Sequence, residues 1–312
     1  MFKLYFFSLN RKHMKSNLNG LISAAVLLCI TCASCKKNDQ PVSFPSTSKS
    51  TTDSLLLNAN SIIANAGDEQ NSEVADIVGS NSVVSGDSVS CRTVTYNSSA
   101  SVYPHLKTVD FGSGCIGKDG ITRSGRKLIT VYADWKNATA GTLISETTFD
   151  NFYVDSVNVS GNSKLYIDSS TKPGMLALKI VTNKTFTDSK GNTSTFMATN
   201  YWLQTAGNNT TTRADNVYRI IGSASGSEVL DGATMLTWTS KIDGANPVIK
   251  MGDCIYRSKG SVDIQLNLEG SSIFNEHLDY GNGTCDNEAT LAINGGMPQQ
   301  VTLPLRFWPL SL

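Results

Sequence analysis

The chain repeats one motif, first as Val109-Asp110-Phe111-Gly112-Ser113-Gly114-Cys115 and again as Leu278-Asp279-Tyr280-Gly281-Asn282-Gly283-Thr284-Cys285. Both copies read apolar, Asp, aromatic, Gly, a small or polar residue, Gly and then Cys, with one extra Thr in the second copy. Another cysteine in a strand-like stretch precedes each copy, Cys91 in the first case and Cys254 in the second. The repetition predicts two copies of one β unit, each closed by a disulfide.

From residue 89 onward, the sequence has the alternating pattern of β-strands. The segments are rich in Val, Ile, Thr, Tyr and Phe, and clusters of Gly, Asn, Asp and Ser separate them. No long helical pattern interrupts them, which argues against parallel βαβ units. The sequence therefore predicts a mainly β fold of antiparallel sheets, either sandwich-like or an extended meander, in two related halves with a short helical lead-in.

Composition divides the chain into five segments. The stretch 206–213 has no apolar residue after Ala206, so it is the best boundary between the two β units or else the longest loop within one domain. The predicted segments are a lipoprotein signal peptide (1–35), a flexible tether (36–52), a helical lead-in (53–88), a first β unit (89–205) and a second β unit (206–312).

The N-terminus has the order of a secretory signal. Basic residues precede the apolar run 21–30, which is too short to span a bilayer. Small residues directly before Cys35 resemble a bacterial lipobox, so we predict that Cys35 carries the lipid; Cys32 is a weaker candidate. The alternative is an ordinary cleaved signal with a free Cys35. Met14 looks like a natural start, which leaves the start at Met1 or Met14 open.

Residues 36–52 are mostly Ser, Thr, Lys, Pro and Asn and cannot bury enough apolar surface to order themselves, so they predict a tether. The lead-in contains two helical patterns. The first follows Asp53-Ser54 and ends at Gly67, and the second runs from Asp68 to Gly79 with Val74, Ile77 and Val78 on one face. We expect both to cover a sheet face or edge; a partner-binding helix is the alternative.

Charge excludes one class of partner. Removal of residues 1–35 takes away four of the 26 basic residues and none of the 26 acidic ones, which leaves a weakly acidic body. The body has no run of Lys and Arg, so the sequence argues against nucleic acid as a partner.

Several stretches together resemble uncharacterised lipoproteins of Bacteroidota. They are 109–112, 119–127, 148–154 and 278–287, and the likeness runs from about Cys91 to the C-terminus. The resemblance implies a secreted, β-rich protein with no assigned activity, so it transfers no catalytic residue. The residues after Cys35 fit the surface-export signal of that group badly, which leaves open whether the protein faces the periplasm or the cell surface.

The sequence motifs give little support for a cofactor site or a metal site. The stretch 112–117 matches GxGxxG, but no helix can follow it, so dinucleotide binding is not expected. His105 and His277 have no ligand cluster around them, and we expect no metal. A calcium loop at 279–288 misses the EF-hand spacing, which favours a polar turn. An aromatic sugar platform from Tyr201, Trp202, Tyr218 and Trp238 competes with ordinary core packing.

Cysteine number and three short motifs predict covalent modifications. Four cysteines remain after signal removal and lipidation, and three pairings are possible. Their matching places in the repeat favour Cys91–Cys115 and Cys254–Cys285, while free thiols or metal ligands are the alternatives. Asp-Ser-apolar sequences at Ser54, Ser88 and Ser156 resemble O-glycan attachment sites of exported Bacteroidota proteins.

Three hypotheses for function remain. The sequence favours a lipid-anchored binding or structural module of the outer membrane that contacts a glycan or an envelope protein, because no catalytic constellation is evident. A hydrolase acting on glycans would need two carboxyls facing each other across a cleft. A carrier of an apolar ligand would need a large apolar cavity.

Overall fold

The computed structural model describes residues 91–99, 101–117, 120–169, 175–207, 214–252, 254–269 and 273–303. The predicted signal peptide, tether and lead-in lie outside the described residues, and with them the predicted sites Cys35, Ser54 and Ser88. No helix within the described ranges has the length and apolar character needed to cross a bilayer.

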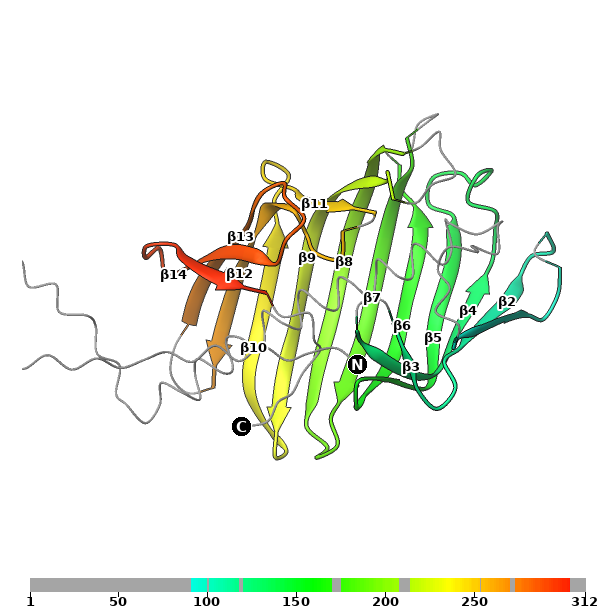
Figure 1. Cartoon of the computed structure of the whole chain (residues 1–312), viewed down its shortest axis with the longest axis horizontal. Helices are drawn as coiled ribbons and strands as arrows, with labels where there is room; N and C mark the ends of the chain where they lie inside the picture. The colour runs from blue at the N-terminus through cyan, green and yellow to red at the C-terminus, as the bar shows by residue number, and fades with distance from the viewer. Residues whose placement is uncertain are drawn as a thin grey trace, which may run out of the picture. The chain divides into compact units, whose positions relative to one another are not determined.

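The described residues form one antiparallel sheet of 15 strands (Figure 1). Its spatial order is β1-β2-β4-β5-β6-β7-β8-β9-β10-β12-β13-β14-β15; β3 pairs with β4, and β11 pairs with β9 and β12. The strands are β1 (Thr93–Tyr96), β2 (His105–Asp110), β3 (Cys115–Ile116), β4 (Thr122–Val131), β5 (Leu143–Val154), β6 (Val157–Ile167), β7 (Ala177–Thr187), β8 (Thr193–Ala206), β9 (Val217–Leu230), β10 (Ala233–Ile242), β11 (Val248–Met251), β12 (Lys259–Leu268), β13 (Ile273–Asn282), β14 (Glu288–Ile293) and β15 (Gln299–Thr302).

The predicted mainly β, antiparallel meander is confirmed, because most neighbours in the sheet are also neighbours in the chain. The described strands belong to a single sheet. All of them lie in one of the two units into which the chain divides, residues 44–312. The predicted boundary at residue 206 falls at the connection between β8 and β9, and the sheet continues across it through pairs such as Trp202 with Ile220.

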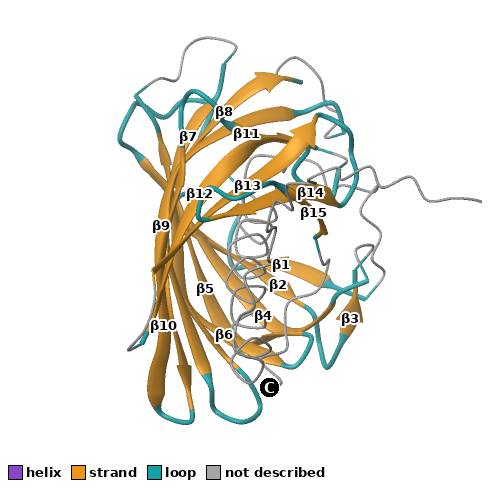
Figure 2. Ribbon diagram, turned by 90° about the vertical axis from the view of Figure 1, so that its left-hand side faces the viewer, coloured by secondary structure: helices purple, strands orange, loops and turns teal. Residues whose placement is uncertain are grey.

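Alternation gives the sheet two different faces. In β7 and β8, for example, Ile180, Phe186, Phe196 and Trp202 are almost fully buried, while the residues that alternate with the buried ones, such as Asn183 and Met197, are exposed or half-buried. We call the buried side the inner face and the other side the outer face. Side chains of successive residues point to opposite faces, so each strand contributes to both. Figure 2 shows the sheet bent, with β1, β2, β14 and β15 on the same side of β9.

Glycine makes room for the largest inner-face side chain. Gly226 in β9 is paired with Trp238 in β10, and a Cβ at position 226 would lie 2.5 Å from Cζ2 of that ring. Trp238 also contacts Phe196 of β8, with ring centroids 5.8 Å apart. The indole can therefore lie over β9 and pack against β8, which joins three strands in one aromatic contact.

The repeated motif forms the same Asp-to-Gly hydrogen bond in both copies, directly after β2 in the first and at the end of β13 in the second. The Gly112 N–H donates to Asp110 Oδ1 at 2.7 Å, and the Gly281 N–H donates to Asp279 Oδ1 at 2.8 Å. Both glycines have positive φ, 59° and 88°, a conformation that favours Gly after an Asp-capped turn. The aromatic residue of each motif is buried.

A disulfide accompanies each of these turns. Cys91 is bonded to Cys115 and Cys254 to Cys285, with Cα atoms 5.4 and 5.6 Å apart. These are the two pairs that the repeated sequence predicts. The first bond attaches the chain before edge strand β1 to β3, and the second attaches the loop before β12 to the segment that follows β13.

Candidate binding surface

The outer face carries rows of hydroxyl and amide side chains that cross the sheet. One row follows printed strand pairings over eight strands, from β5 to β13, and we call it the polar ladder. Its members are exposed or half-buried and uncharged. They are Thr148, Asn162, Asn183, Met197, Ser225, Thr239, Gln265 and Asn275.

A second row of the same chemistry runs beside the ladder. It contains Ser160, Thr185, Thr195, Ser227, Thr237 and Asn267. Thr195 and Ser227 hydroxyls lie 2.9 Å apart, and the Ser227 N–H donates to Thr195 Oγ1 at 2.9 Å. Neighbouring strands lie roughly 4.8 Å apart, so the two rows present a polar group at each strand step except at Met197 of β8.

Three pairs of oppositely charged or basic and acidic side chains lie on the outer face. Lys164 Nζ lies 3.7 Å from Glu146 Oε1, and His277 Nδ1 lies 2.7 Å from Asp263 Oδ1. Arg126 likewise contacts Asp150. Each of these three carboxylates thus faces a basic group, whereas a glycosidase places two carboxyls opposite one another.

Three of the four aromatic residues considered for a sugar platform pack in the core, the outcome that the sequence favoured. Trp202, Tyr218 and Trp238 belong to the inner face and are at most 8% exposed. Trp202 packs on Tyr218, with centroids 5.6 Å apart. Tyr201 alone of the four points to the outer face, where its exposed fraction is 37%. Tyr201 and Trp202 are consecutive residues of β8, and successive side chains of a strand point to opposite faces of the sheet. The two aromatic rings therefore lie on different faces.

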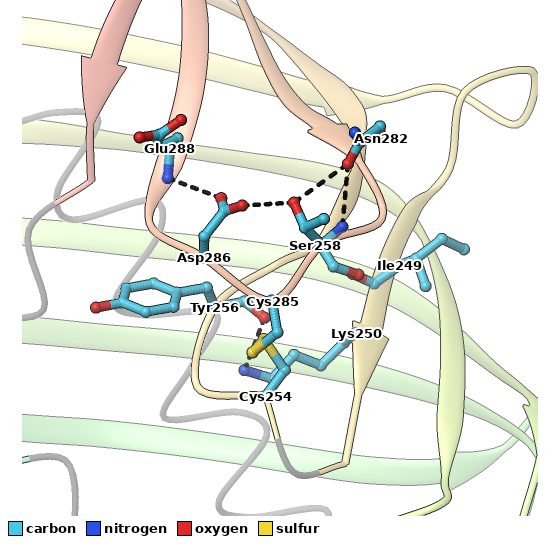
Figure 3. Close-up of a disulfide and its surroundings, with 10 residues drawn as sticks. Ile249, Lys250, Cys254, Tyr256, Ser258, Asn282, Cys285, Asp286 and Glu288 are labelled. Carbon is cyan, nitrogen blue, oxygen red and sulfur yellow. Dashed lines mark hydrogen bonds between the residues drawn. A yellow bond between two sulfur atoms is a disulfide. The ribbon is translucent and has the colours of Figure 1, made fainter.

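The second copy of the motif forms a polar turn. Asn282 Oδ1 accepts from the Thr284 N–H, and Asp286 accepts from the Thr284 hydroxyl and from the Glu288 N–H (Figure 3). These bonds, the Thr284 bond first, hold the pKa of Asp286 below its ordinary value. The Asp286 carboxylate therefore makes hydrogen bonds within the turn beside Cys254–Cys285.

The histidines lie apart from one another. His105 is buried near Tyr96 and Tyr103, and its Nδ1 lies 3.1 Å from the Val102 carbonyl. His277 is exposed and contacts Asp263. Within the described ranges, no three side chains of His, Cys, Asp or Glu gather in a way that could hold a metal ion.

Ser156, one of the three predicted glycosylation sites, is exposed in the turn between β5 and β6. The preceding Asp155 has a φ of 46°, and its carboxylate accepts from the Thr122 N–H at 3.0 Å. The Ser156 side chain is therefore exposed beside a hydrogen-bonded turn residue, and its modification stays a prediction.

One cavity of about 170 Å³ lies at the β14–β15 edge and is lined by Leu291, Ile293, Met297 and Val301, among others. It is smaller than the roughly 300 Å³ at which sites for drug-sized ligands begin. Met297 is 86% exposed, so the cavity is open at its side. It offers little support for a carrier of a large apolar ligand.

Sequence reasoning missed the buried polar residues of the inner face. Glu228 is fully buried in β9 and accepts a hydrogen bond from Ser194, while its other oxygen, Oε1, has no partner among the described residues. Burial raises the pKa of Glu228 to about 8, and the Ser194 bond opposes that shift. The alternation along β9 could have revealed the burial of Glu228, because Glu228 lies two residues before the buried Leu230 and so points to the same face.

No family model, curated protein or solved structure matches this chain.

Proposed function

We propose that the chain is a lipid-anchored binding protein of the cell envelope and that its outer face binds a glycan. The observation that supports this most directly is the polar ladder with its neighbouring row. Hydroxyl and amide side chains both donate and accept hydrogen bonds, so a regular array of them complements a polymer rich in hydroxyl groups.

Composition favours a glycan over a protein on this surface. Protein interfaces are enriched in aromatic residues, Met and Arg and depleted in Ser. Between β7 and β10, the two rows contain Asn183, Ser225 and Thr239, together with Thr185, Thr195, Ser227 and Thr237, and Met197 is their apolar member. Tyr201, exposed on the same face, adds one ring surface on which a sugar can stack.

The proposed lipid anchor and cellular location are inferred from the N-terminal sequence. A basic–apolar–small–Cys order ending at Cys35, followed by a tether, suits an outer-membrane lipoprotein that faces the periplasm or the cell surface. The two disulfides are consistent with an oxidising compartment. We also propose that the two disulfide-closed turns descend from one duplicated β unit, because both carry the same Asp-to-Gly hydrogen bond.

A glycan array tests the binding function, with lipid-free protein beginning at residue 53. We expect polysaccharide binding that Asn183→Asp weakens about tenfold, since this change removes two donors in the centre of the ladder. Gln299→Glu on edge strand β15 makes the same kind of change away from the ladder and serves as the control. Equal loss in both variants, or capture of a protein with no glycan bound, would contradict the proposal.

A further inference from the structure

The outer face carries basic side chains on the five strands from β6 to β10, in the middle of the sheet (Figure 1). The alternation of each strand places them there. They are Lys164 in β6, Lys179 in β7, Arg219 in β9 and Lys241 in β10. These five strands contain one acidic residue, Glu228, and it is buried on the inner face. Their outer positions therefore present positive charge without negative charge.

Three of these residues lie along one side of the polar ladder, and we call Lys164, Lys179 and Lys241 the basic strip. Lys164 lies two residues after Asn162 in β6, and Lys241 lies two residues after Thr239 in β10, so each is about 7 Å from the ladder along its strand. Lys179 lies on the same side, four residues from the ladder in β7. The second polar row lies on the opposite side. A polymer on the ladder would therefore have ammonium groups along one edge.

Two tyrosines flank Lys179 across the strands. Tyr166 of β6 pairs with Lys179, and Lys179 pairs with Tyr201 of β8. All three are exposed or half-buried on the outer face. Two strand steps of roughly 4.8 Å separate the tyrosines, and the lysine stands between them. A tyrosine offers an apolar ring and a polar hydroxyl, and a lysine offers a mobile positive charge with three donors. This combination suits a sugar ring that carries a carboxylate or a sulfate.

Acidic residues near this surface lie at its margins. Glu146 on β5 contacts Lys164 at 3.7 Å, Asp243 after β10 contacts Lys241 at 3.3 Å, and Asp168 follows the end of β6. The two contacts are solvent-accessible ion pairs, and such pairs contribute little free energy. A polyanion can therefore replace the two carboxylates at modest cost.

We propose that the outer face binds an acidic polysaccharide, whose chain crosses the strands on the polar ladder and directs its carboxylate or sulfate groups to the basic strip. This inference rests on the proposed glycan-binding function and adds the class of glycan. The formal net charge of the whole chain is zero, so the attraction comes from the local arrangement of the lysines. Attraction between exposed charges is screened by salt, which makes the preference for an acidic glycan dependent on ionic strength.

Binding of the full mature chain to matched polysaccharides tests the charge requirement. Polygalacturonate is compared with its methyl ester, and dextran sulfate with dextran. At least one acidic polymer should bind about tenfold or more tightly than its neutral counterpart at about 0.1 M salt, and most of this difference should disappear at about 1 M salt. Equal binding within each pair would overturn the inference and leave glycan binding intact, whereas binding to no polysaccharide would contradict the proposed function itself. Binding to phosphatidylglycerol vesicles but to neither acidic polymer would overturn the inference in favour of a membrane surface.

Substitution of Lys179 tests the location of the contact. Lys179→Gln should weaken binding of the acidic polymer about fivefold and reduce its salt dependence, while Lys179→Arg keeps the charge and should stay within about twofold of the original chain. Lys190→Gln, in the turn at the far end of β7, removes the same charge away from the strip and serves as the control. Unchanged binding in Lys179→Gln, or an equal loss in Lys190→Gln, would overturn the assignment. If Lys179→Gln does not fold, Lys241→Gln replaces it with the same readout, and unchanged binding there would overturn the assignment as well.

Discussion

The hydroxyl of Ser194 on β8 donates a hydrogen bond to the carboxyl of Glu228 on β9, and both side chains are fully buried. Burial disfavours the charged form and raises the pKa of Glu228 from 4.5 to about 8, although the bond from Ser194 favours the carboxylate. At neutral pH the folded protein therefore holds a proton that the unfolded chain has released.

This difference makes folding stability depend on pH. Below pH 4.5 both states are protonated and there is no penalty. Between pH 4.5 and about 8 the unfolded state ionises first, so the free energy of unfolding falls as pH rises, and above about 8 the penalty is constant. At 1.36 kcal/mol for each pKa unit, the loss is on the order of 3–5 kcal/mol.

We expect Glu228→Gln to remove this part of the pH dependence while keeping the shape and an acceptor for Ser194. Urea unfolding at pH 5, 7 and 9 measures it, and the variant should gain stability relative to the original chain as pH rises. Glu146→Gln, on the outer face beside Lys164, is the matched control and should leave the pH profile nearly unchanged. An identical pH slope in Glu228→Gln and the original chain would refute the assignment.

Gly226 is expected to be required for the position of Trp238. An alanine Cβ would lie 2.1 Å from the Thr195 carbonyl oxygen as well as 2.5 Å from the indole, so strand and ring must move apart. Gly226→Ala should cost about 1–3 kcal/mol of unfolding free energy and shift tryptophan fluorescence. Gly244→Ala is the control, because its Cβ would meet only ordinary contact at 3.8 Å. Equal effects of the two substitutions would show that the ring does not depend on this glycine.

The alternation of apolar and polar residues predicts most of the strands. The extent of the other strands depends on pairing with strands that are distant in the sequence. The repeated motif in 278–285 has the composition of a turn, yet Leu278 and Asp279 belong to β13 and pair with β12. The middle of β9 consists of Gly, Ser and Ala and lacks apolar alternation, but pairing with β8 and β10 keeps the strand continuous. Lys127, Lys184 and Glu228 occupy strand positions where the alternation expects apolar side chains. Their burial could therefore be inferred from their position in the strand but not from their residue type.

The disulfide Cys254–Cys285 should contribute measurably to stability. It joins residues 31 positions apart, and closing a loop of that length stabilises by about 3–4 kcal/mol in the chain-entropy model. Replacing both cysteines by Ser should lower the urea midpoint, and peptide mapping without reductant should recover Cys91–Cys115 unchanged. Finding Cys91 joined to another cysteine in the original chain would contradict the pairing.

Lipid attachment at Cys35 is a prediction from the sequence. Metabolic labelling with a fatty acid should label the protein, and Cys35→Ala should abolish the label. Cys32→Ala should leave it, because Cys32 precedes the expected cleavage site. A label that persists in Cys35→Ala would move the anchor to another residue.

The two Asp-capped turns should respond alike to substitution. Asp110→Ala removes the acceptor for the Gly112 N–H, and Asp279→Ala removes the acceptor for the Gly281 N–H, so each should cost about 0.5–1.5 kcal/mol of unfolding free energy. Asn keeps the Oδ1 acceptor, and Asp110→Asn and Asp279→Asn should therefore stay within a few tenths of a kcal/mol of the original chain. Urea unfolding of the four variants measures both effects. If one Ala variant is silent while the other is strongly destabilised, the two turns do not play the same structural role, and the proposed duplication loses its main structural support.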